Sequence, residues 1–230
     1  MSFPCAPLLL SLLLISLHTY GQQSTSSTYQ IKSGTVYDKE SGKLLTEDEM
    51  AELFANGNPI LEPRMDKYGQ PSSFTVDRSG SGSRINTRDA SKRPLPGEEV
   101  LPFIMKSLSG ESLDSEALRG QFILLHFELV VSPPIFSLSK FNEMQSSIES
   151  IKKEDSLVAI SVFQSSQQDI EAVLELSQYP SQIVADGRGF SVRYQITDFP
   201  SFLLIGKRGE LIGYYKRSEW NKLKSDLAKY

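Results

Sequence analysis

From residue 101 to the C-terminus, apolar residues recur in blocks that have the lengths of strands and helices. Two nearly continuous apolar runs, Phe122–Val131 and Leu157–Phe163, are typical of strands buried on both faces of a sheet. An amphipathic helix is predicted between them, because apolar residues return every three or four positions, at Phe141, Met144, Ile148 and Ile151. A second helix is predicted from about Gln167, with Ile170, Val173 and Leu174 facing inward. This order of strand, helix, strand and helix predicts parallel pairing through right-handed crossovers.

Shorter elements are predicted on either side of this unit. Before it, the pattern indicates a strand at Phe103–Met105 and a brief helix-like connector at Leu113–Leu118. After it, we expect a short helix through Tyr194 and a β-hairpin with strands at Phe202–Ile205 and Leu211–Tyr215. The chain closes with a helix that we expect Ser218 to cap, with inward positions at Trp220, Leu223 and Leu227.

Residues 22–77 are predicted to form a small N-terminal segment of a hairpin and a helix. Glu40–Lys43 is a glycine-containing turn signal between two extended runs. Thr46 and Glu49 have the spacing of a capping box, which predicts a short helix ending near Gly57, and Ser72–Val76 is a candidate strand. Residues 78–99 lack apolar periodicity and are predicted to be a flexible linker. One function open to the segment is docking onto the following domain or onto another protein.

The first 21 residues are predicted to be a signal peptide. They contain no charged side chain, and Ala6–Leu17 is an apolar run of about a dozen residues, too short for a membrane span. The alternative is a short uncleaved anchor. Cleavage would leave a mature chain that begins near Gln22, has no stable membrane span and lies in an extracytoplasmic compartment, periplasmic or secreted.

Composition narrows the chemistry further. The formal net charge is −4 and no run of Lys or Arg is present, so a nucleic-acid partner is not expected. Cys5 is the only cysteine, and it lies within the predicted signal peptide, so the mature chain would have no thiol. His126 would be the only mature histidine, which argues against a zinc site. We predict no cofactor and no metal.

Three segments resemble one protein family. Residues 118–136 (LRGQFILLHFELVVSPPIF) resemble the active-site region of the TlpA-like extracytoplasmic thiol-disulfide oxidoreductases of the thioredoxin-like superfamily. Residues 102–120 (PFIMKSLSGESLDSEALRG) are similar to their lead-in, and residues 197–213 (TDFPSFLLIGKRGELIG) to their cis-proline hairpin. The resemblance implies an α/β, thioredoxin-like fold over residues 100–230, with a central mixed sheet flanked by helices. It also implies a cis bond between Phe199 and Pro200, facing the active-site loop.

The chain departs from this family at the residues that carry its chemistry. The two family cysteines fall on Ser132 and Ile135, so the motif reads Ser132-Pro133-Pro134-Ile135. Thiol exchange needs a thiolate that attacks a disulfide and a second thiol that resolves the mixed disulfide. We therefore expect a redox-inactive, non-catalytic protein that holds a peptide or protein partner at the former active-site face, formed by these four residues with Phe199 and Pro200. The alternative is a thiol-disulfide oxidoreductase or antioxidant-type enzyme, as the family would imply. Pro133 and Pro134 are expected to start the helix that follows.

His126 and Glu128 share one face of their predicted strand. With Ser132 they raise the possibility of a Ser/His/Glu triad, but such triads are recognised by geometry that one strand does not show. The other interpretation is that His126 is a core residue with satisfied hydrogen bonds and that Glu128 points toward the loop.

Overall fold

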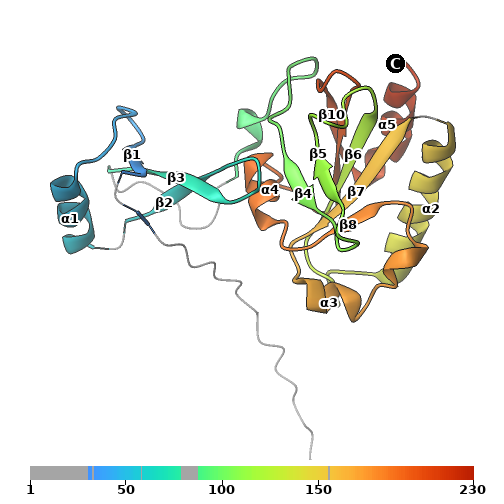
Figure 1. Cartoon of the computed structure of the whole chain (residues 1–230), viewed down its shortest axis with the longest axis horizontal. Coiled ribbons are helices and arrows are strands. Elements are labelled where there is room, and N and C mark those ends of the chain that lie inside the picture. The colour runs from blue at the N-terminus through green and yellow to red at the C-terminus, as the bar shows by residue number, and fades with distance from the viewer. Residues whose placement is uncertain (1–30, 33, 58, 79–87, 155) are drawn as a thin grey trace, which may run out of the picture. The chain divides into compact units, whose positions relative to one another are not determined.

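A computed structural model describes residues 31–32, 34–57, 59–78, 88–154 and 156–230 (Figure 1). The predicted signal peptide with Cys5 lies outside the described residues, as does most of the first half of the predicted linker. Within the described ranges, no helix is both long and apolar enough to cross a membrane.

The larger part of the described chain is built on a five-stranded sheet of order β10-β9-β6-β7-β8. Its strands are β6 (Phe122–Glu128), β7 (Leu157–Phe163), β8 (Gln182–Val184), β9 (Ser201–Ile205) and β10 (Leu211–Lys216). The predicted parallel pairing of β6 with β7 is confirmed, as is the antiparallel hairpin of β9 and β10. β6 also pairs antiparallel with β9, so it lies in the middle of a mixed sheet. It ends at Glu128, three residues earlier than the apolar run suggested.

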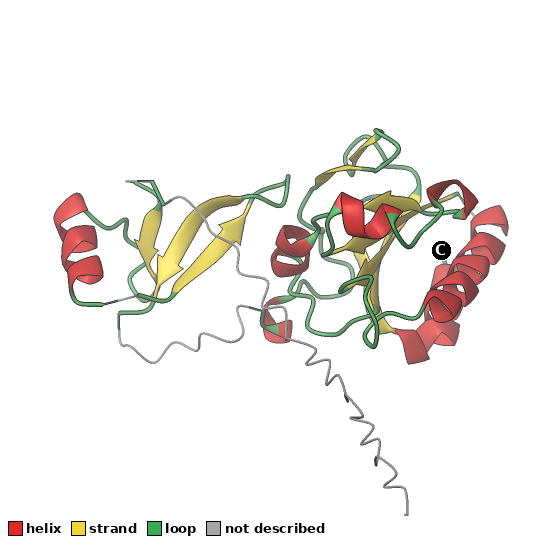
Figure 2. Ribbon diagram, turned by 90° about the horizontal axis from the view of Figure 1, so that it is seen from below, coloured by secondary structure: helices red, strands yellow, loops and turns green. Residues whose placement is uncertain are grey.

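Helices cover both faces of this sheet (Figure 2). On one face, α2 (Leu138–Glu154) and α5 (Trp220–Leu227) pack Met144, Ile148 and Leu223 against Phe122 and Leu124 of β6. On the other face, Phe190 of α4 (Arg188–Arg193) joins a core that contains the alternate β6 residues Ile123, Leu125 and Phe127. A central strand with apolar residues on both faces is what the continuous run of β6 predicts.

Two details of the predicted helices are wrong. In α3 (Gln167–Glu171) and the turn after it, Ile170 and Leu174 are buried, but Val173 is 39% exposed. The α-helix ends at Glu171, so the positions that follow no longer keep the helical spacing. The final helix begins at Trp220, after a 3-10 turn at Arg217–Glu219, and no side chain caps it. The Lys216 N–H instead donates to Glu219 Oε2 (2.8 Å), so Ser218 is not the cap.

A hairpin of β4 (Ile104–Lys106) and β5 (Ser112–Asp114) precedes the central sheet. The predicted helix-like connector at Leu113–Leu118 is therefore wrong at its start, because Leu113 is a buried strand residue paired with Met105. The turn between these strands also contacts the central sheet, since the Leu108 N–H donates to the Ile183 carbonyl of β8 (2.8 Å). This bond covers part of one edge of the sheet.

The N-terminal segment contains a three-stranded sheet and one helix. The strands are β1 (Val36–Asp38), β2 (Leu61–Met65) and β3 (Pro71–Val76), in the order β1-β3-β2. The helix α1 (Glu47–Ala55) has the predicted capping box between Thr46 and Glu49. The predicted hairpin has one bridge, between Tyr37 and Leu44, and β1 also pairs in parallel with β3.

The turn between β2 and β3 approaches the following domain closely. The Ile104 N–H donates to the Lys67 carbonyl (2.7 Å), and the Arg193 guanidinium donates to the Met65 carbonyl. Gly189 lies so near that a Cβ atom there would overlap the carbonyl oxygen of Gly69.

The second half of the predicted linker is ordered, which corrects the expectation for residues 88–99. Ala90–Lys92 form a 3-10 turn. The backbone of Glu99 forms an isolated antiparallel β-bridge with that of Glu210, at the end of the β9–β10 turn. The Gly97 N–H donates to the Leu211 carbonyl, and the Leu211 N–H donates to the Glu98 carbonyl, both at 2.8 Å. The amino-acid composition of residues 88–99 does not predict this order, because backbone hydrogen bonds rather than buried apolar side chains hold the stretch in place.

Candidate functional site

The motif Ser132-Pro133-Pro134-Ile135 lies in the loop that follows the C-terminal end of β6. Two hydrogen bonds hold the start of this loop to the chain after β7: Gln164 N–H to the Leu129 carbonyl (2.9 Å) and Val131 N–H to Ser165 Oγ (3.0 Å). The Phe136 N–H then donates to the Ser132 carbonyl (3.0 Å) and closes a turn. We call residues 132–135 the motif turn.

The motif turn is exposed, and its main apolar side chain points to solvent. All four of its residues are exposed, and Ile135 keeps 63% of its surface in contact with water. Phe136, directly after it, is buried and packs against Phe141 and Phe163 at ring-centre distances of 5.6 and 6.0 Å. The buried ring anchors the turn while leaving Ile135 available to another molecule.

The two prolines do not start the helix, contrary to the prediction. α2 begins at Leu138, because the residues from Ser132 to Phe136 are used by the turn. The Pro133–Pro134 bond is cis, which was not predicted from the sequence.

Phe199 and Pro200 are placed beside the end of β6 by strand pairing. The Phe199–Pro200 bond is cis, as the resemblance implies. Ser201 is the partner of Phe127, so continuing the same register brings Pro200 opposite Glu128. Within the described part of the chain, the backbone groups of Asp198 and Phe199 make no hydrogen bond with other backbone groups.

One residue at this site was missed by sequence reasoning. The guanidinium of Arg88, from the predicted linker, lies over the ring of Phe199 with its carbon 5.3 Å from the ring centre. Burial lowers the pKa of Arg88, and the positive charge of Arg188 lowers it further. No local pattern in the sequence links residues so far apart along the chain.

A buried polar cluster lies just inside the sheet at the same end. His126 is 1% exposed, with its ring stacked on Phe202 at 4.6 Å. His126 Nε2 is 3.2 Å from Glu128 Oε1, and Nδ1 is 3.4 Å from Ser161 Oγ. Gln145 donates from Nε2 to Ser161 Oγ (3.0 Å) and accepts at Oε1 from Ser181 Oγ (2.7 Å). We call His126, Glu128, Gln145, Ser161 and Ser181 the buried polar cluster.

This geometry does not place Ser132 in a triad with His126. The two ring nitrogens face Glu128 and Ser161, whereas Ser132 lies in the exposed motif turn. Ser161 contacts His126, which contacts Glu128, as a nucleophilic serine does in a catalytic triad. Ser161 is completely buried, however, so no substrate reaches its hydroxyl. A histidine with both nitrogens occupied agrees with the interpretation as a satisfied core residue.

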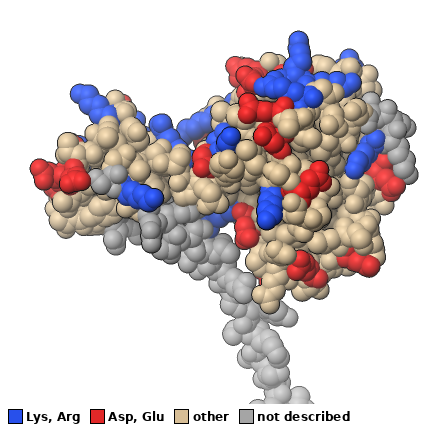
Figure 3. Space-filling model, in the orientation of Figure 1, with Lys and Arg blue, Asp and Glu red and all other residues tan. Residues whose placement is uncertain are grey.

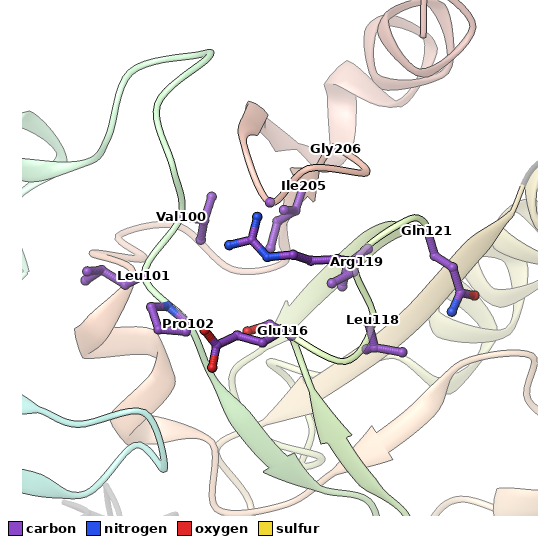
Figure 4. Close-up of a pocket in the computed structure, with 12 residues that line it drawn as sticks. Val100, Leu101, Pro102, Glu116, Leu118, Arg119, Gln121, Ile205 and Gly206 are labelled. Carbon is purple, nitrogen blue, oxygen red and sulfur yellow. The ribbon is translucent and has the colours of Figure 1, made fainter.

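Other cavities occur among the described residues, and one of about 340 Å³ is lined by the charged side chains of Asp38, Lys39, Glu40, Asp77 and Arg78. The cavity in Figure 4, between Arg119, Glu116 and Gly206, measures about 20 Å³, which is room for roughly one water molecule. No group of three or more His, Cys, Asp or Glu side chains gathers as a metal site in the ranges that the structure covers. On the face in Figure 3, acidic and basic side chains are interspersed.

The topology defines the class of protein. A β6-α2-β7-α3 unit followed by an antiparallel β9-β10 hairpin and α5, with strand order β10-β9-β6-β7, is the arrangement of a thioredoxin-like fold. The strand β8 extends this sheet beside β7. The fold predicted from the resemblance is thus confirmed.

Comparison with known proteins finds similarity to solved structures. The chain is similar to a thiol-disulfide oxidoreductase from Bacteroides fragilis (19% identity, 56% of this chain and 98% of that chain, TM-score 0.46). It is also similar to StoA from Bacillus subtilis (24% identity, 57% and 99%, TM-score 0.44). A third is the thioredoxin domain of a thiol-disulfide oxidoreductase from Bacteroides vulgatus (15% identity, 57% and 97%, TM-score 0.46). No model of a known family and no curated protein matches the chain.

Proposed function

We propose that this protein is an exported, thioredoxin-fold binding protein that holds an extended peptide segment without thiol chemistry. The site is the motif turn together with Phe199 and Pro200. The observation that carries the proposal is the exposed Ile135 (63%) in a turn where serine and isoleucine occupy both positions of the family cysteines. The exposed apolar side chain of Ile135 is suited to peptide binding, and so is the backbone of Asp198 and Phe199, which makes no hydrogen bond to other described backbone groups.

The proposed occupant is an extended segment with an apolar side chain. Its backbone would pair with the groups of Asp198 and Phe199, which make no hydrogen bond to other described backbone groups. Its apolar side chain would contact Ile135. Pairing of this kind supplies affinity from the main chain, while the side-chain contact supplies selectivity.

The test is selection of a phage-displayed random heptapeptide library on wild-type protein and on Ile135→Asp. We expect peptides with a central apolar residue to be enriched on the wild type and lost with Ile135→Asp. Val173→Asp is the matched control, because Val173 is also a partly exposed apolar residue but lies outside the site. Equal enrichment on wild type and Ile135→Asp would refute the proposed site.

A second assay separates this function from thiol-disulfide exchange. We expect the protein not to accelerate the reduction of insulin by dithiothreitol, because one cysteine cannot complete the exchange cycle by itself. Acceleration above a buffer control would favour the oxidoreductase instead.

A further inference from the structure

Residues 88–93 lie along the loop that leads to Pro200. The Asp89 N–H donates to Gln195 Oε1 (2.6 Å). Arg93 donates from Nε to the Gln195 carbonyl (2.9 Å) and from a terminal nitrogen to Thr197 Oγ1 (2.8 Å). We call residues 88–93 the cover and residues 194–199 the covered loop.

The cover also places two cations on aromatic rings. Arg88 lies over Phe199, and Arg93 lies over Tyr214 with its guanidinium carbon 4.6 Å from the ring centre. Such contacts are attractive because the face of an aromatic ring carries negative charge. The ring of Phe199, part of the proposed site, is therefore shielded on one side by Arg88.

The cover is held without a buried apolar anchor. Every residue from 88 to 99 is exposed or half-buried, and Leu95 is 66% exposed. By contrast, the β6 residues from Phe122 to Phe127 are all buried. Segments with few buried apolar contacts open locally at a small fraction of the free energy of global unfolding. The cover is thus expected to open while the sheet stays folded.

We propose that the cover is an autoinhibitory contact that shields Phe199 when closed and exposes it when it opens locally. The role of a partner in this proposal rests on the peptide-binding function proposed above. The local opening and its coupling to the covered loop do not depend on that function.

Hydrogen exchange measured by mass spectrometry on the full chain tests the opening. The covered loop has protected amides, since Gln195 N–H donates to the Val192 carbonyl and Ile196 N–H donates to the Ser191 carbonyl. Arg93→Ala should accelerate exchange in both the cover and the covered loop by about tenfold, as expected for losing hydrogen bonds to a charged group. Exchange in β6 should not change. Lys92→Ala is the control, because Lys92 is exposed in the same turn.

Two results would overturn the coupling. One is acceleration in the cover alone, with the covered loop unchanged in Arg93→Ala. The other is exchange of both segments only at the rate of β6, which would mean that the cover opens only on global unfolding.

Two further readouts test the shielding of Phe199. Arg88→Ala and Arg93→Ala should bind the dye anilinonaphthalene sulfonate more strongly than Lys92→Ala, and unchanged dye binding would overturn the shielding. Peptides selected on the wild type should bind both variants with about tenfold higher affinity. The closed form, in which the cover shields Phe199, would no longer compete with peptide binding. Unchanged affinity would overturn autoinhibition. If no Ile135-dependent peptide is found on any variant, the proposed function fails, and exchange and dye binding alone decide whether the cover opens.

Discussion

Two members of the buried polar cluster, His126 and Glu128, lie at the C-terminal end of β6, a few residues before the motif turn, yet the cluster and the turn differ in what they offer. The cluster holds an imidazole, a carboxylate and two hydroxyls within hydrogen-bonding distance of one another, but His126 and Ser161 are almost or completely inaccessible. The motif turn is exposed, but its side chains are a serine, two prolines and an isoleucine. Reactive groups and accessibility are therefore separate properties, and a catalytic site needs both.

The largest expected effect is a loss of stability when the buried polar cluster is broken. His126→Ala removes a ring stacked on Phe202 and leaves the Ser161 and Glu128 groups without their histidine partner. We expect a loss of about 3 kcal/mol in the free energy of unfolding. Urea denaturation measures it, with Ile135→Ala as the matched exposed change, expected to cost under about 0.5 kcal/mol. A similar loss of unfolding free energy in His126→Ala and Ile135→Ala would contradict this difference between the buried polar cluster and the motif turn.

A smaller pair of effects of opposite sign is expected from two buried serines. Ser201, directly after Pro200, is buried and its hydroxyl has no hydrogen-bond partner among the described residues, whereas the Ser181 hydroxyl donates to Gln145. Ser201→Ala should therefore raise the free energy of unfolding by about 1 kcal/mol, and Ser181→Ala should lower it by about 1 kcal/mol. Thermal denaturation of both variants checks the signs. A loss with Ser201→Ala would indicate that its hydroxyl is satisfied by water.

Asp226 forms a second polar cluster, whose contribution to stability depends on pH. Hydrogen bonds from Lys229, Lys222 and Tyr215 hold the pKa of Asp226 well below its ordinary value of 3.8. The folded state thus binds this proton more weakly than the unfolded chain, so the carboxylate stabilises the fold above pH 3.8 and this contribution is lost as pH falls further. Asp226→Asn should lower Tm at pH 7, and the difference from wild type should shrink below pH 3.8. A difference that stays constant down to strongly acidic pH would contradict this linkage.

The smallest expected effect is at the motif turn itself. A thiol placed by Ser132→Cys, in a chain with Cys5→Ser, should keep an ordinary pKa of about 8.5, because α2 begins only at Leu138 and its N-terminus is not at this residue. Thiolate absorbance against pH measures it, with Ser177→Cys as an exposed control. A pKa below about 7 would show that the turn still activates a thiol.

Sequence reasoning succeeded where burial is decided by local pattern. The bounds of β7 were predicted without error, and the predicted inward positions of α2, from Phe141 to Ile151, are buried, because continuous runs and three-to-four spacing report directly on burial. The edge strand β2 was missed because Pro63 and Arg64 interrupt its pattern, and β8 because it has only three residues.

The candidate site was predictable only in part. The cis bond between Phe199 and Pro200 followed from the resemblance, whereas the partner face at the motif turn stays a prediction. The role of Arg88 at this site was not predictable. Its contact with Phe199 joins two residues far apart in the sequence, and no hydrophobic periodicity links them. The buried polar cluster also depends on Ser161 and Ser181, small residues that sequence patterns rarely mark as core.

The contacts of the cover join residues more than 100 positions apart, such as Asp89 with Gln195. Bringing together residues so far apart in the chain lowers its conformational entropy. These contacts bury little apolar surface that could offset the loss. They are therefore expected to form after the central sheet has assembled. The last folding step would then be the closure of the cover, and a newly folded molecule would expose Phe199 before it becomes shielded.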